Sequence, residues 1–387
     1  MTDREHSRWM ARALQLARHG LYTTRPNPRV GCVIVRNGKA AGEGWHMQAG
    51  EPHAEVLALR AAGNAARGAT VYLTLEPCAH HGRTPPCADA LVDAGVARVV
   101  VAMRDPDPRV AGAGLARLRE AGIEVIEGVA NEAAAQLNPG FLSRVQHGRP
   151  WVCLKAAMSL DGRTAMASGE SRWVTGPEAR EEVHHLRARS AAVMTGSGTV
   201  LADDPSLNVR LDGGVPHPGG SALPWPRPLR VVLDSQLRMA PASRMLALEG
   251  QTLVLAARDH ASRRQALEQA GAEVAVVGGD AQVDLAAALA LLGEREINEV
   301  LVEAGPRLGG ALLAAGLVDE LVIYMAPHLM GDAARGLFTL PGLERMAQRL
   351  PVEMIDIQRV GEDWRITARP KFEKLNMKSM KGTKNMK

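Results

Sequence analysis

Hydrophobic and polar residues in the first part of the chain alternate between a helical and a strand-like spacing. Residues 3–19 place apolar side chains on one face of a helix, at Trp9, Met10, Ala13, Leu14 and Ala17. A buried strand over 30–35 then ends at the turn Asn37-Gly38, and a second strand with two glycines follows. The pattern continues with helices over 52–62, 86–94 and 114–121, strands over 69–75, 98–103 and 123–127, and a helix that contains Ala133 and Leu137.

A second alternation begins after a linker predicted over 146–150. It predicts a helix over 179–188, a helix behind the glycine-rich residues 305–310, and strands over 151–156, 191–195, 229–233, 252–256, 274–277, 297–303 and within 317–325. Residues 212–228 are rich in glycine and proline and predict a long surface loop. We therefore predict an α/β protein whose first domain, 1–147, has three layers and whose second α/β domain covers 148–370.

Composition supports this division and excludes some classes of protein. A chain of 387 residues fits two domains, and 46% hydrophobic with 23% charged residues is ordinary globular usage. The longest apolar run, residues 285–292, is far shorter than the ~20 residues that span a bilayer. The N-terminus is polar and shows no signal peptide, so we expect a cytoplasmic protein.

The basic charge belongs to the end of the chain. Residues 371–387 hold six lysines and one glutamate, a formal charge of +5. The whole chain has a formal net charge of +4, so residues 1–370 carry a charge of −1. This segment lacks apolar periodicity, and we expect a disordered basic tail. The charge therefore gives no reason to expect a nucleic-acid partner.

A candidate metal site lies in the first half. It consists of His53, Cys78 and Cys87, with Glu55 two positions after the histidine. One imidazole and two thiolates suit Zn²⁺, and three protein ligands leave one position for water, as in catalytic zinc sites. Both cysteines follow a proline, which predicts that each begins a helix whose N-terminus favours the thiolate. Cys32 and Cys153 lie in apolar runs and are expected to be buried thiols.

Glu55 can serve the same site as His53 only in the first turn of a helix, because residues i and i+2 do not face each other further along. Pro52 places the pair there. The carboxylate is then positioned to move protons between a metal-activated water and a leaving amine. A structural zinc site, or two unrelated thiols, is the alternative.

His-x-Glu with Pro-Cys and a second cysteine is the signature of zinc nucleobase deaminases, although eight residues here separate cysteines that are normally two apart. The chain resembles the bacterial bifunctional riboflavin-biosynthesis deaminase/reductase family, in which the longer spacing is usual. The resemblance rests on Asn27-Pro28, Val30-Gly31, residues 50–55, residues 74–78 and residues 80–87. It implies a cytidine-deaminase-like fold, with His53, Cys78 and Cys87 as zinc ligands and Glu55 as the proton shuttle.

The resemblance also implies that Asn27 and the loop His80–Arg83 contact the substrate. The two histidines and Arg83 of this loop could instead be solvated residues or rival zinc ligands.

For the second half, the resemblance implies a dihydrofolate-reductase-like domain that uses NADPH. Motifs that carry it include Ser159–Arg163, Gly169–Trp173, Thr199–Pro205 and Val302–Pro306. The implied cofactor contacts are Ala157, Trp173, Thr199, Asp203, Ser235, Gly305, Pro306, Arg307, Leu308, Gly309, Gly310 and Ala311. The implied substrate contacts are Ser171, Arg187, Leu207, Arg210 and Glu303.

Several of these assignments have structural alternatives. The glycine turn after Glu303 suits a phosphate at a helix N-terminus, where a side chain at Gly309 would obstruct it, but from the residues alone a tight connection explains it equally well. Trp173 could be a core residue. Lys155 and Asp161 could lie near the sugar or form structural ion pairs.

The family resemblance implies two consecutive reactions on a small phosphorylated pyrimidine. The first is hydrolytic deamination of 2,5-diamino-6-(5-phosphoribosylamino)pyrimidin-4-one, and the second is NADPH-dependent reduction of the product's ribosyl group to ribityl. A nucleic-acid base deaminase would need a basic, aromatic-lined channel, whereas this chain is 3% aromatic and its body is slightly acidic. A zinc module without catalysis is the other alternative. We expect no nucleic-acid or membrane partner, and a homo-oligomer is compatible with the sequence.

Overall fold

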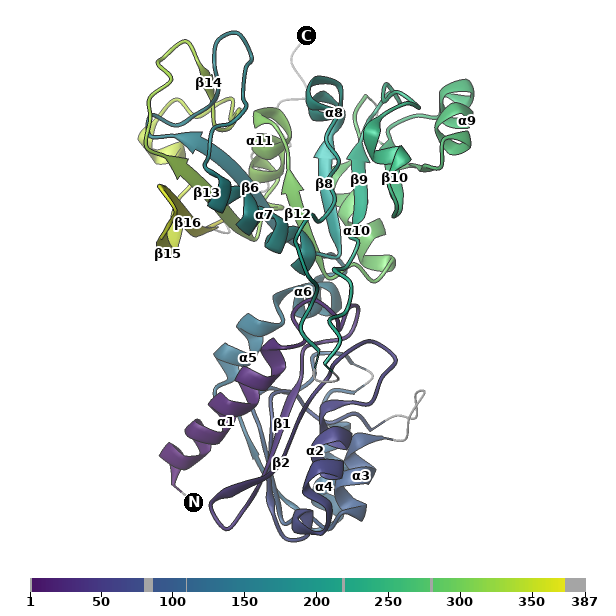
Figure 1. The fold of residues 1–387 in the computed structure, drawn as a ribbon, viewed down its shortest axis with the longest axis vertical. Coiled ribbons are helices and arrows are strands. Elements are labelled where there is room, and N and C mark those ends of the chain that lie inside the picture. The colour runs from purple at the N-terminus through teal and green to yellow at the C-terminus, as the bar shows by residue number, and fades with distance from the viewer. Residues whose placement is uncertain (1, 80–85, 109, 218–219, 279–280, 373–387) are drawn as a thin grey trace. The chain divides into compact units, whose positions relative to one another are not determined.

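The computed structural model describes residues 2–79, 86–108, 110–217, 220–278 and 281–372 (Figure 1). It divides into two compact units. Unit 1 comprises residues 1–150, 213–226 and 289–299, and unit 2 comprises residues 151–212, 227–288 and 300–387. Two segments from the second half of the sequence thus belong to unit 1, so a single domain boundary at residue 147 stays a prediction.

Unit 1 is built on a five-stranded sheet in the order β2-β1-β3-β4-β5. β1 pairs antiparallel with both β2 and β3, whereas β3, β4 and β5 are parallel. These strands are β1 (Gly31–Arg36), β2 (Lys39–Trp45), β3 (Thr70–Leu73), β4 (Arg98–Val101) and β5 (Glu124–Glu127). The predicted strands of the first half are therefore confirmed.

Helices cover both faces of this sheet. Val33 and Val35 of β1 pack in one core with α1 (Asp3–Arg18) and α5 (Asn131–Leu137). Cys32 and Ile34, which point to the opposite face, pack with α2 (Ala54–Ala62), α3 (Cys87–Asp93) and α4 (Ala113–Glu120). Successive strand residues point to opposite faces, so an apolar run without alternation fills both cores. The predicted three-layer arrangement is confirmed.

The predicted helix that contains Ala133 and Leu137 is confirmed as α5, and a second helix that the sequence did not predict follows it. α5 ends at Leu137, and α6 (Pro139–His147) begins at a proline, which lacks the N–H that a continuous helix would need there. Gly148 then ends α6 in a left-handed conformation with φ 68°. The linker predicted over 146–150 is therefore wrong in its first two residues, which are helical.

Two glycines of β2 let α2 approach the sheet closely. A Cβ atom at Gly42 would lie 2.2 Å from the Ala58 carbonyl oxygen, and one at Gly44 would lie 2.5 Å from the Ala54 carbonyl oxygen. No side chain fits at such distances. The close packing fixes the start of α2, which carries His53 and Glu55.

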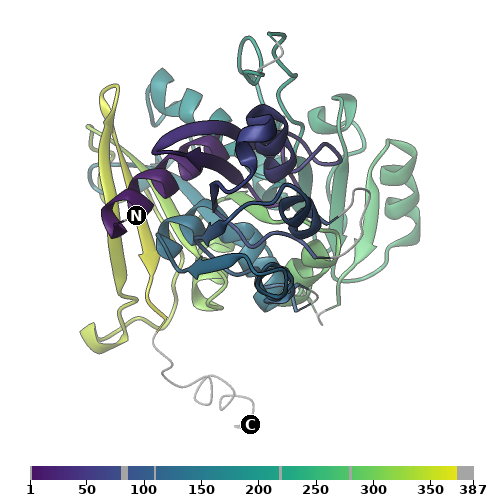
Figure 2. The same cartoon turned by 90° about the horizontal axis from the view of Figure 1, so that it is seen from below.

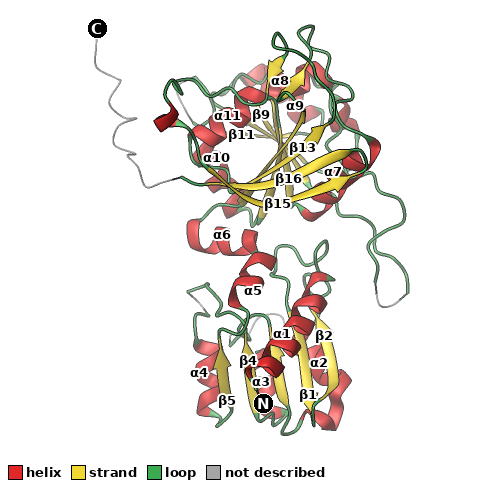
Figure 3. Cartoon of the chain, turned by 90° about the vertical axis from the view of Figure 1, so that its left-hand side faces the viewer, coloured by secondary structure: helices red, strands yellow, loops and turns green. Residues whose placement is uncertain are grey.

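Unit 2 contains a nine-stranded sheet in the order β11-β10-β9-β8-β12-β6-β13-β16-β15 (Figure 3). Its parallel part comprises β6 (Trp151–Ser159), β8 (Ala192–Gly196), β9 (Leu229–Leu233), β10 (Thr252–Ala256), β11 (Glu273–Val276), β12 (Glu299–Glu303) and β13 (Glu320–Ala326). β15 (Val352–Val360) and β16 (Asp363–Pro370) extend it as an antiparallel hairpin, seen in yellow in Figure 2. The sequence did not predict this hairpin, nor the short pair β7 (Arg163–Ala165) and β14 (Arg335–Gly336).

The helices of unit 2 follow the strands of the parallel part. They are α7 (Pro177–Arg189), α8 (Ser197–Asp203), α9 (Ala261–Gln269) and α11 (Pro306–Ala314), whereas α10 (Leu285–Glu294) begins in unit 2 and belongs to unit 1 from residue 289 onward. The predicted helix over 179–188 and the helix behind the glycine turn are confirmed, whereas α8, α9 and α10 were not predicted. Side chains of α7, α8 and α9 share one core with the strands.

The segment predicted as a tail begins within the fold. The Lys371 backbone N–H donates to the Pro351 carbonyl at 2.8 Å, and the Phe372 ring lies 3.8 Å from a Cβ position at Gly316. Residues 373–387 lie outside the described residues. Among the described residues, no helix has the length and apolar character needed to cross a membrane.

The packing of α2 on β2 can be tested with Gly44→Ala. The added methyl group would meet the Ala54 carbonyl, and overpacking of this kind typically costs ~1–3 kcal/mol. We expect a lower unfolding midpoint in denaturant and weaker metal retention. Ala40→Ser is the matched control, because Ala40 is an exposed residue of the same strand. An unchanged midpoint for Gly44→Ala would contradict the close approach.

Candidate zinc, cofactor and substrate sites

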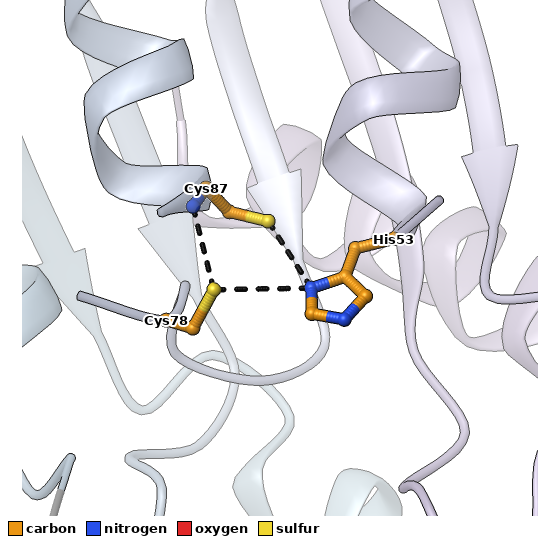
Figure 4. Close-up of side chains that lie close together, drawn as sticks. All are labelled: His53, Cys78 and Cys87. Carbon is orange, nitrogen blue, oxygen red and sulfur yellow. Dashed lines mark hydrogen bonds between the residues drawn. The ribbon is translucent and has the colours of Figure 1, made fainter. Parts of the chain in front are cut away.

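His53, Cys78 and Cys87 converge from three segments of unit 1 (Figure 4). His53 is the N-cap residue of α2, Cys87 is the first residue of α3, and Cys78 lies in the loop after β3. His53 Nδ1 lies 3.2 Å from Cys87 Sγ and 3.8 Å from Cys78 Sγ. All three candidate ligand atoms lie within 4.8 Å of one another.

These distances fit a tetrahedral zinc ion. Zn–S bonds of about 2.3 Å and Zn–N bonds of about 2.1 Å place sulfur and nitrogen ligands roughly 3.6 Å apart. The imidazole-to-sulfur distances of 3.2 and 3.8 Å bracket this value. The donor set of one imidazole and two thiols is also the set that Zn²⁺ prefers. The residues present therefore fit the ion, with His53 Nδ1 as its nitrogen ligand.

The prediction that Cys78 begins a helix is wrong, because it lies in a loop. It nevertheless benefits from a helix N-terminus, since its sulfur accepts the Cys87 backbone N–H of α3 at 3.3 Å. A hydrogen bond with the Cys87 thiol lowers the pKa of Cys78 to about 4, and the same contact raises the pKa of Cys87. A coordinated thiol is deprotonated outright, so a bound cation would favour the thiolate form of both cysteines.

Glu55 lies in the first turn of α2 and only 4% of its surface is exposed. The prediction that its helix starts just before it is confirmed. Burial raises the pKa of Glu55 to about 6, because the charged form loses its hydration. A buried carboxyl group with a pKa near neutrality can both accept and return a proton.

Asn27 is linked to the candidate metal site by His46, a residue that the sequence analysis missed. Its side-chain amide lies 3.0 Å from His46 Nε2, and the His46 ring packs edge-on against His53 with centroids 5.3 Å apart. Burial lowers the pKa of His46 to about 4, so its ring is neutral. His46 follows β2 directly, and a lone histidine after a glycine-rich strand gave no signal for a site.

Glu76 holds the Cys78 loop in place. Its buried carboxylate accepts backbone N–H groups from Asp105, Gly112, Gly114 and Leu115 at 3.0–3.4 Å. Its own N–H donates to the Met103 carbonyl at 2.9 Å. Charge-assisted hydrogen bonds of this kind are strong. The predicted substrate loop His80–Arg83 continues the same segment but lies outside the described residues.

In unit 2, two helices start side by side at the carboxyl ends of β8 and β12. A Cβ atom at Gly196, which ends β8, would lie 3.4 Å from the Leu308 side chain of α11. From β8 the chain continues through α8 to β9, which is the next strand toward one edge of the sheet. From β12 it continues through α11 to β13, which lies toward the other edge. Such a switch point is where open α/β sheets bind their ligands.

The glycines after β12 have different roles. A Cβ atom at Gly309 would lie 3.2 Å from the Phe338 ring, and one at Gly310 would lie 2.0 Å from the Thr339 carbonyl oxygen. Both glycines therefore allow α11 to pack against residues 338–339. A side chain at Gly309 would press on the Phe338 ring and not, as predicted, on a cofactor phosphate. Gly305, the N-cap residue of α11, has no atom within 4 Å of its Cβ position. Of these three, only Gly305 faces open space.

Four of the other predicted cofactor contacts come from elements next to β8 and β12 in the sheet or from the helix after β8. Thr199 and Asp203 belong to α8, Ser235 follows β9, and Ala157 lies in β6. The Ser235 hydroxyl accepts the Val283 N–H at 3.1 Å. Trp173 is 69% exposed and the Arg180 guanidinium lies 4.7 Å from its ring centroid, which excludes a core role.

The predicted substrate residues form a charged cluster at the end of β12. Arg187 of α7 donates to both carboxylate oxygens of Glu303, at 2.6 and 2.9 Å, and to the Asn208 carbonyl at 2.9 Å. Both side chains of the ion pair are largely buried. Burial lowers the pKa of Lys155, whereas the nearby Glu303 charge raises it. The structure therefore brings Lys155, Arg187 and Glu303 together.

The remaining substrate residues lie on an adjoining segment. Leu207 is buried with φ 49°, a strained left-handed conformation for a branched residue. Arg210 is exposed, and its backbone N–H donates to His184 Nδ1 at 3.2 Å. Burial lowers the pKa of His184 to about 4, so the ring is neutral and can accept this bond. His184 was missed because its partner lies 26 residues away, and Ser171 is half-buried in the loop before Trp173.

Among the described residues, Asp161 forms hydrogen bonds within unit 2 rather than the ion pair that was its structural alternative. Its carboxylate accepts the Ser159 hydroxyl at 2.5 Å and the Gly331 N–H at 2.8 Å. These bonds, led by that of Ser159, lower the pKa of Asp161 to about 2. The side chain joins two loops of unit 2.

Comparison with known families assigns both halves. Residues 3–103 match the cytidine and deoxycytidylate deaminase zinc-binding region, and residues 150–366 match the RibD C-terminal domain. With the sites described above, these matches define a two-domain enzyme, a zinc-site deaminase joined to a reductase.

The relatives define the family. The chain is 53% identical over 360 residues to the riboflavin biosynthesis protein RibD of Escherichia coli, covering 92% of this chain and 96% of that protein. It is 48% identical over 367 residues to RibD of Haemophilus influenzae, covering 94% and 97%. The chain belongs to the RibD family, and it is a bifunctional enzyme of riboflavin biosynthesis.

A solved structure shows the same fold along almost the whole chain. Acinetobacter baumannii RibD aligns with a TM-score of 0.86 and 45% identity, covering 96% of this chain and 100% of that one. The predicted fold class, with a cytidine-deaminase-like domain before a dihydrofolate-reductase-like domain, is confirmed.

The ligand set can be tested by metal analysis. We expect about one zinc per chain in the purified protein, and its loss in Cys78→Ser and in Cys87→Ser, because a serine hydroxyl does not ionise as a thiol does. Zinc content is measured by mass spectrometry alongside the melting temperature. Cys32→Ala is the control, since Cys32 is a buried core thiol in β1. Full zinc retention in both serine variants would exclude this ligand set.

Proposed function

We propose that unit 1 deaminates 2,5-diamino-6-(5-phosphoribosylamino)pyrimidin-4-one and that unit 2 reduces the ribosyl group of 5-amino-6-(5-phosphoribosylamino)uracil with NADPH. The Thermotoga maritima protein that aligns with a TM-score of 0.82 and 32% identity, over 95% of this chain and 99% of that one, is named as a deaminase and reductase of these two compounds. The observation that carries the first activity is the convergence of His53, Cys78 and Cys87 beside the buried Glu55.

In the deaminase, the protein side chains hold the metal and move the protons. Zn²⁺, when bound by His53, Cys78 and Cys87, supplies a Lewis acid that lowers the pKa of water. Glu55 accepts a proton from the attacking water and delivers it to the departing amine. The bond to the amine breaks as the ring carbon gains the water oxygen, so ammonia leaves and a carbonyl remains. Asn27 and His46 are positioned to orient the pyrimidine.

In the reductase, we assign the crevice between the ends of β8 and β12 to NADPH. Gly305 lets the backbone at the α11 N-terminus approach a cofactor phosphate, which the partial positive charge of the helix favours. When bound, the nicotinamide supplies the hydride. The exposed Trp173 contacts the same cofactor.

The charged cluster holds the substrate. Glu303, fixed by Arg187, accepts hydrogen bonds from sugar hydroxyls. The exposed guanidinium of Arg210 suits the substrate phosphate through two parallel hydrogen bonds. His184 and Arg187 together fix the segment that carries Arg210.

Glu55→Gln tests the proton transfer. The amide keeps the size of the side chain but cannot accept and return a proton, and loss of a general acid/base typically costs ~10²–10⁴-fold in rate. We expect ammonia release from the diamino substrate to fall by this factor while zinc content stays unchanged.

The same variant contains its own control, because the reductase does not depend on Glu55. NADPH oxidation with the deaminated substrate should continue at the wild-type rate. Near-wild-type ammonia release would reject the role of Glu55.

Gly305→Val tests the cofactor assignment. The valine side chain has room at this extended position (φ −70°, ψ 174°), so the fold should be retained. It would stand in the path of a phosphate that approaches the helix N-terminus. We expect a higher dissociation constant for NADPH, measured by calorimetry, with unchanged ammonia release.

Gly309→Ala provides the contrast for this experiment. Its methyl group would press on Phe338, so it should lower the melting temperature. Wild-type NADPH affinity in Gly305→Val would leave the turn after β12 as a structural connection.

A further inference from the structure

The loop between α1 and β1 carries Asn27, the proposed substrate contact of the deaminase. No helix or strand fixes the backbone at this residue, so contacts from other segments determine where its amide points. Two of these contacts come from far along the sequence. They are made by Asn298 and Glu299, which belong to unit 1 together with the loop.

Asn298 holds the peptide group that leads into Asn27. Its Nδ2 donates to the Pro26 carbonyl at 2.7 Å, and its Oδ1 accepts from Arg144 Nε at 2.6 Å. These partners fix the orientation of the amide, because a carbonyl only accepts hydrogen bonds and a guanidinium only donates them. The Asn298 residue is buried. The backbone before Asn27 is therefore held by a side chain that is itself held.

Glu299 holds the loop two residues after Asn27. Its Oε1 accepts from Arg29 Nη2 at 2.7 Å, and the two side chains are only 8% and 6% exposed. Arg29 also donates to the Leu137 carbonyl at 2.7 Å, and its backbone N–H donates to the Asn138 side chain at 2.8 Å. A buried ion pair with additional hydrogen bonds has a well-defined geometry. The loop is thus fixed on both sides of Asn27.

Residues 298 and 299 are in turn packed against α6. A Cβ atom at Gly140 of this helix would lie 2.5 Å from the Asn298 carbonyl oxygen and 2.4 Å from Glu299 Cγ. Only a glycine allows a helix to approach so closely. Asn298 and Glu299 therefore form a rigid support for the loop.

We propose that Asn298 and Glu299 are positioning residues of the deaminase, which hold Asn27 where it meets the pyrimidine. This inference rests on the deamination and on the Asn27 contact proposed above. The Asn27 amide lies 3.0 Å from His46, whose ring packs against His53. An amide that is fixed before the substrate arrives does not have to be ordered on binding, so less binding energy is lost. Substrate affinity in the first reaction therefore depends on two residues from the second half of the sequence.

Asn298→Asp tests this inference in the full-length zinc-loaded protein. The carboxylate keeps the size of the side chain and an acceptor for Arg144, but it cannot donate to the Pro26 carbonyl. Loss of one hydrogen bond should raise KM for the diamino substrate about 3- to 10-fold, with kcat for ammonia release unchanged. Zinc content should also stay unchanged, because neither bond of Asn298 involves a candidate zinc ligand.

Glu299→Gln is a second, independent variant. It keeps an acceptor for Arg29 but removes the charge, and it should raise KM in the same direction. Melting temperatures are measured for both variants, and either one carries the test if the other is unstable. Ser143→Ala is the matched control, because it removes a hydrogen bond from α6 to the Arg149 carbonyl, which does not involve the loop of Asn27. It should leave KM unchanged.

A double-mutant cycle separates positioning from a general loosening of the fold. Asn27→Ala should raise KM by itself, and adding Asn298→Asp to it should raise KM no further, because the effect passes through Asn27. The inference would be overturned by an unchanged KM in the stable single variants, or by an increase that persists in full without Asn27. An unchanged KM in Asn27→Ala would reject the Asn27 contact and this inference with it, while the deamination itself stands. Wild-type protein that releases no ammonia from the diamino substrate would instead reject the proposed function.

Discussion

The half-buried Cys78 thiol, the buried Cys87 thiol and the buried Glu55 carboxyl group lie around one imidazole, and these acidic groups can all ionise only beside a cation. The packing of unit 1 brings these acidic groups together. The glycines of β2 bring the start of α2 to the site, the first residue of α3 supplies one sulfur, and the loop after β3 supplies the other. The metal binding and the proton transfer that we propose therefore depend on the same packing.

In unit 2, by contrast, buried charged side chains form an ion pair with each other. Arg187 and Glu303 neutralise each other within the fold, and both are largely buried. The exposed guanidinium group of Arg210 is the group that we propose for the substrate phosphate. The segment that carries Arg210 is held by the Arg187 bond to the Asn208 carbonyl and by the His184 ring, which accepts the Arg210 N–H.

Local patterns in the sequence predicted much of the fold and the metal ligands. Pro52 and Pro86 mark the starts of α2 and α3, so the positions of Glu55 and Cys87 followed from spacing alone. What failed depends on contacts between distant segments. The packing role of Gly309 depends on its contact with Phe338, and the place of His46 at the site depends on its contact with Asn27. The helix α8, which was not predicted, forms at the end of the sheet. In the β15–β16 hairpin, β15 is mostly exposed and its hydrophobic residues have no clear period.

Glu76 ties the loop of one zinc ligand to a segment made much later. Its carboxylate accepts N–H groups from residues up to Leu115, and Gly114 sits directly against the Pro77 carbonyl. During synthesis, Cys78 therefore emerges from the ribosome well before the chain that fixes it. The metal site can reach its final geometry only after residue 115 has been added and has folded back.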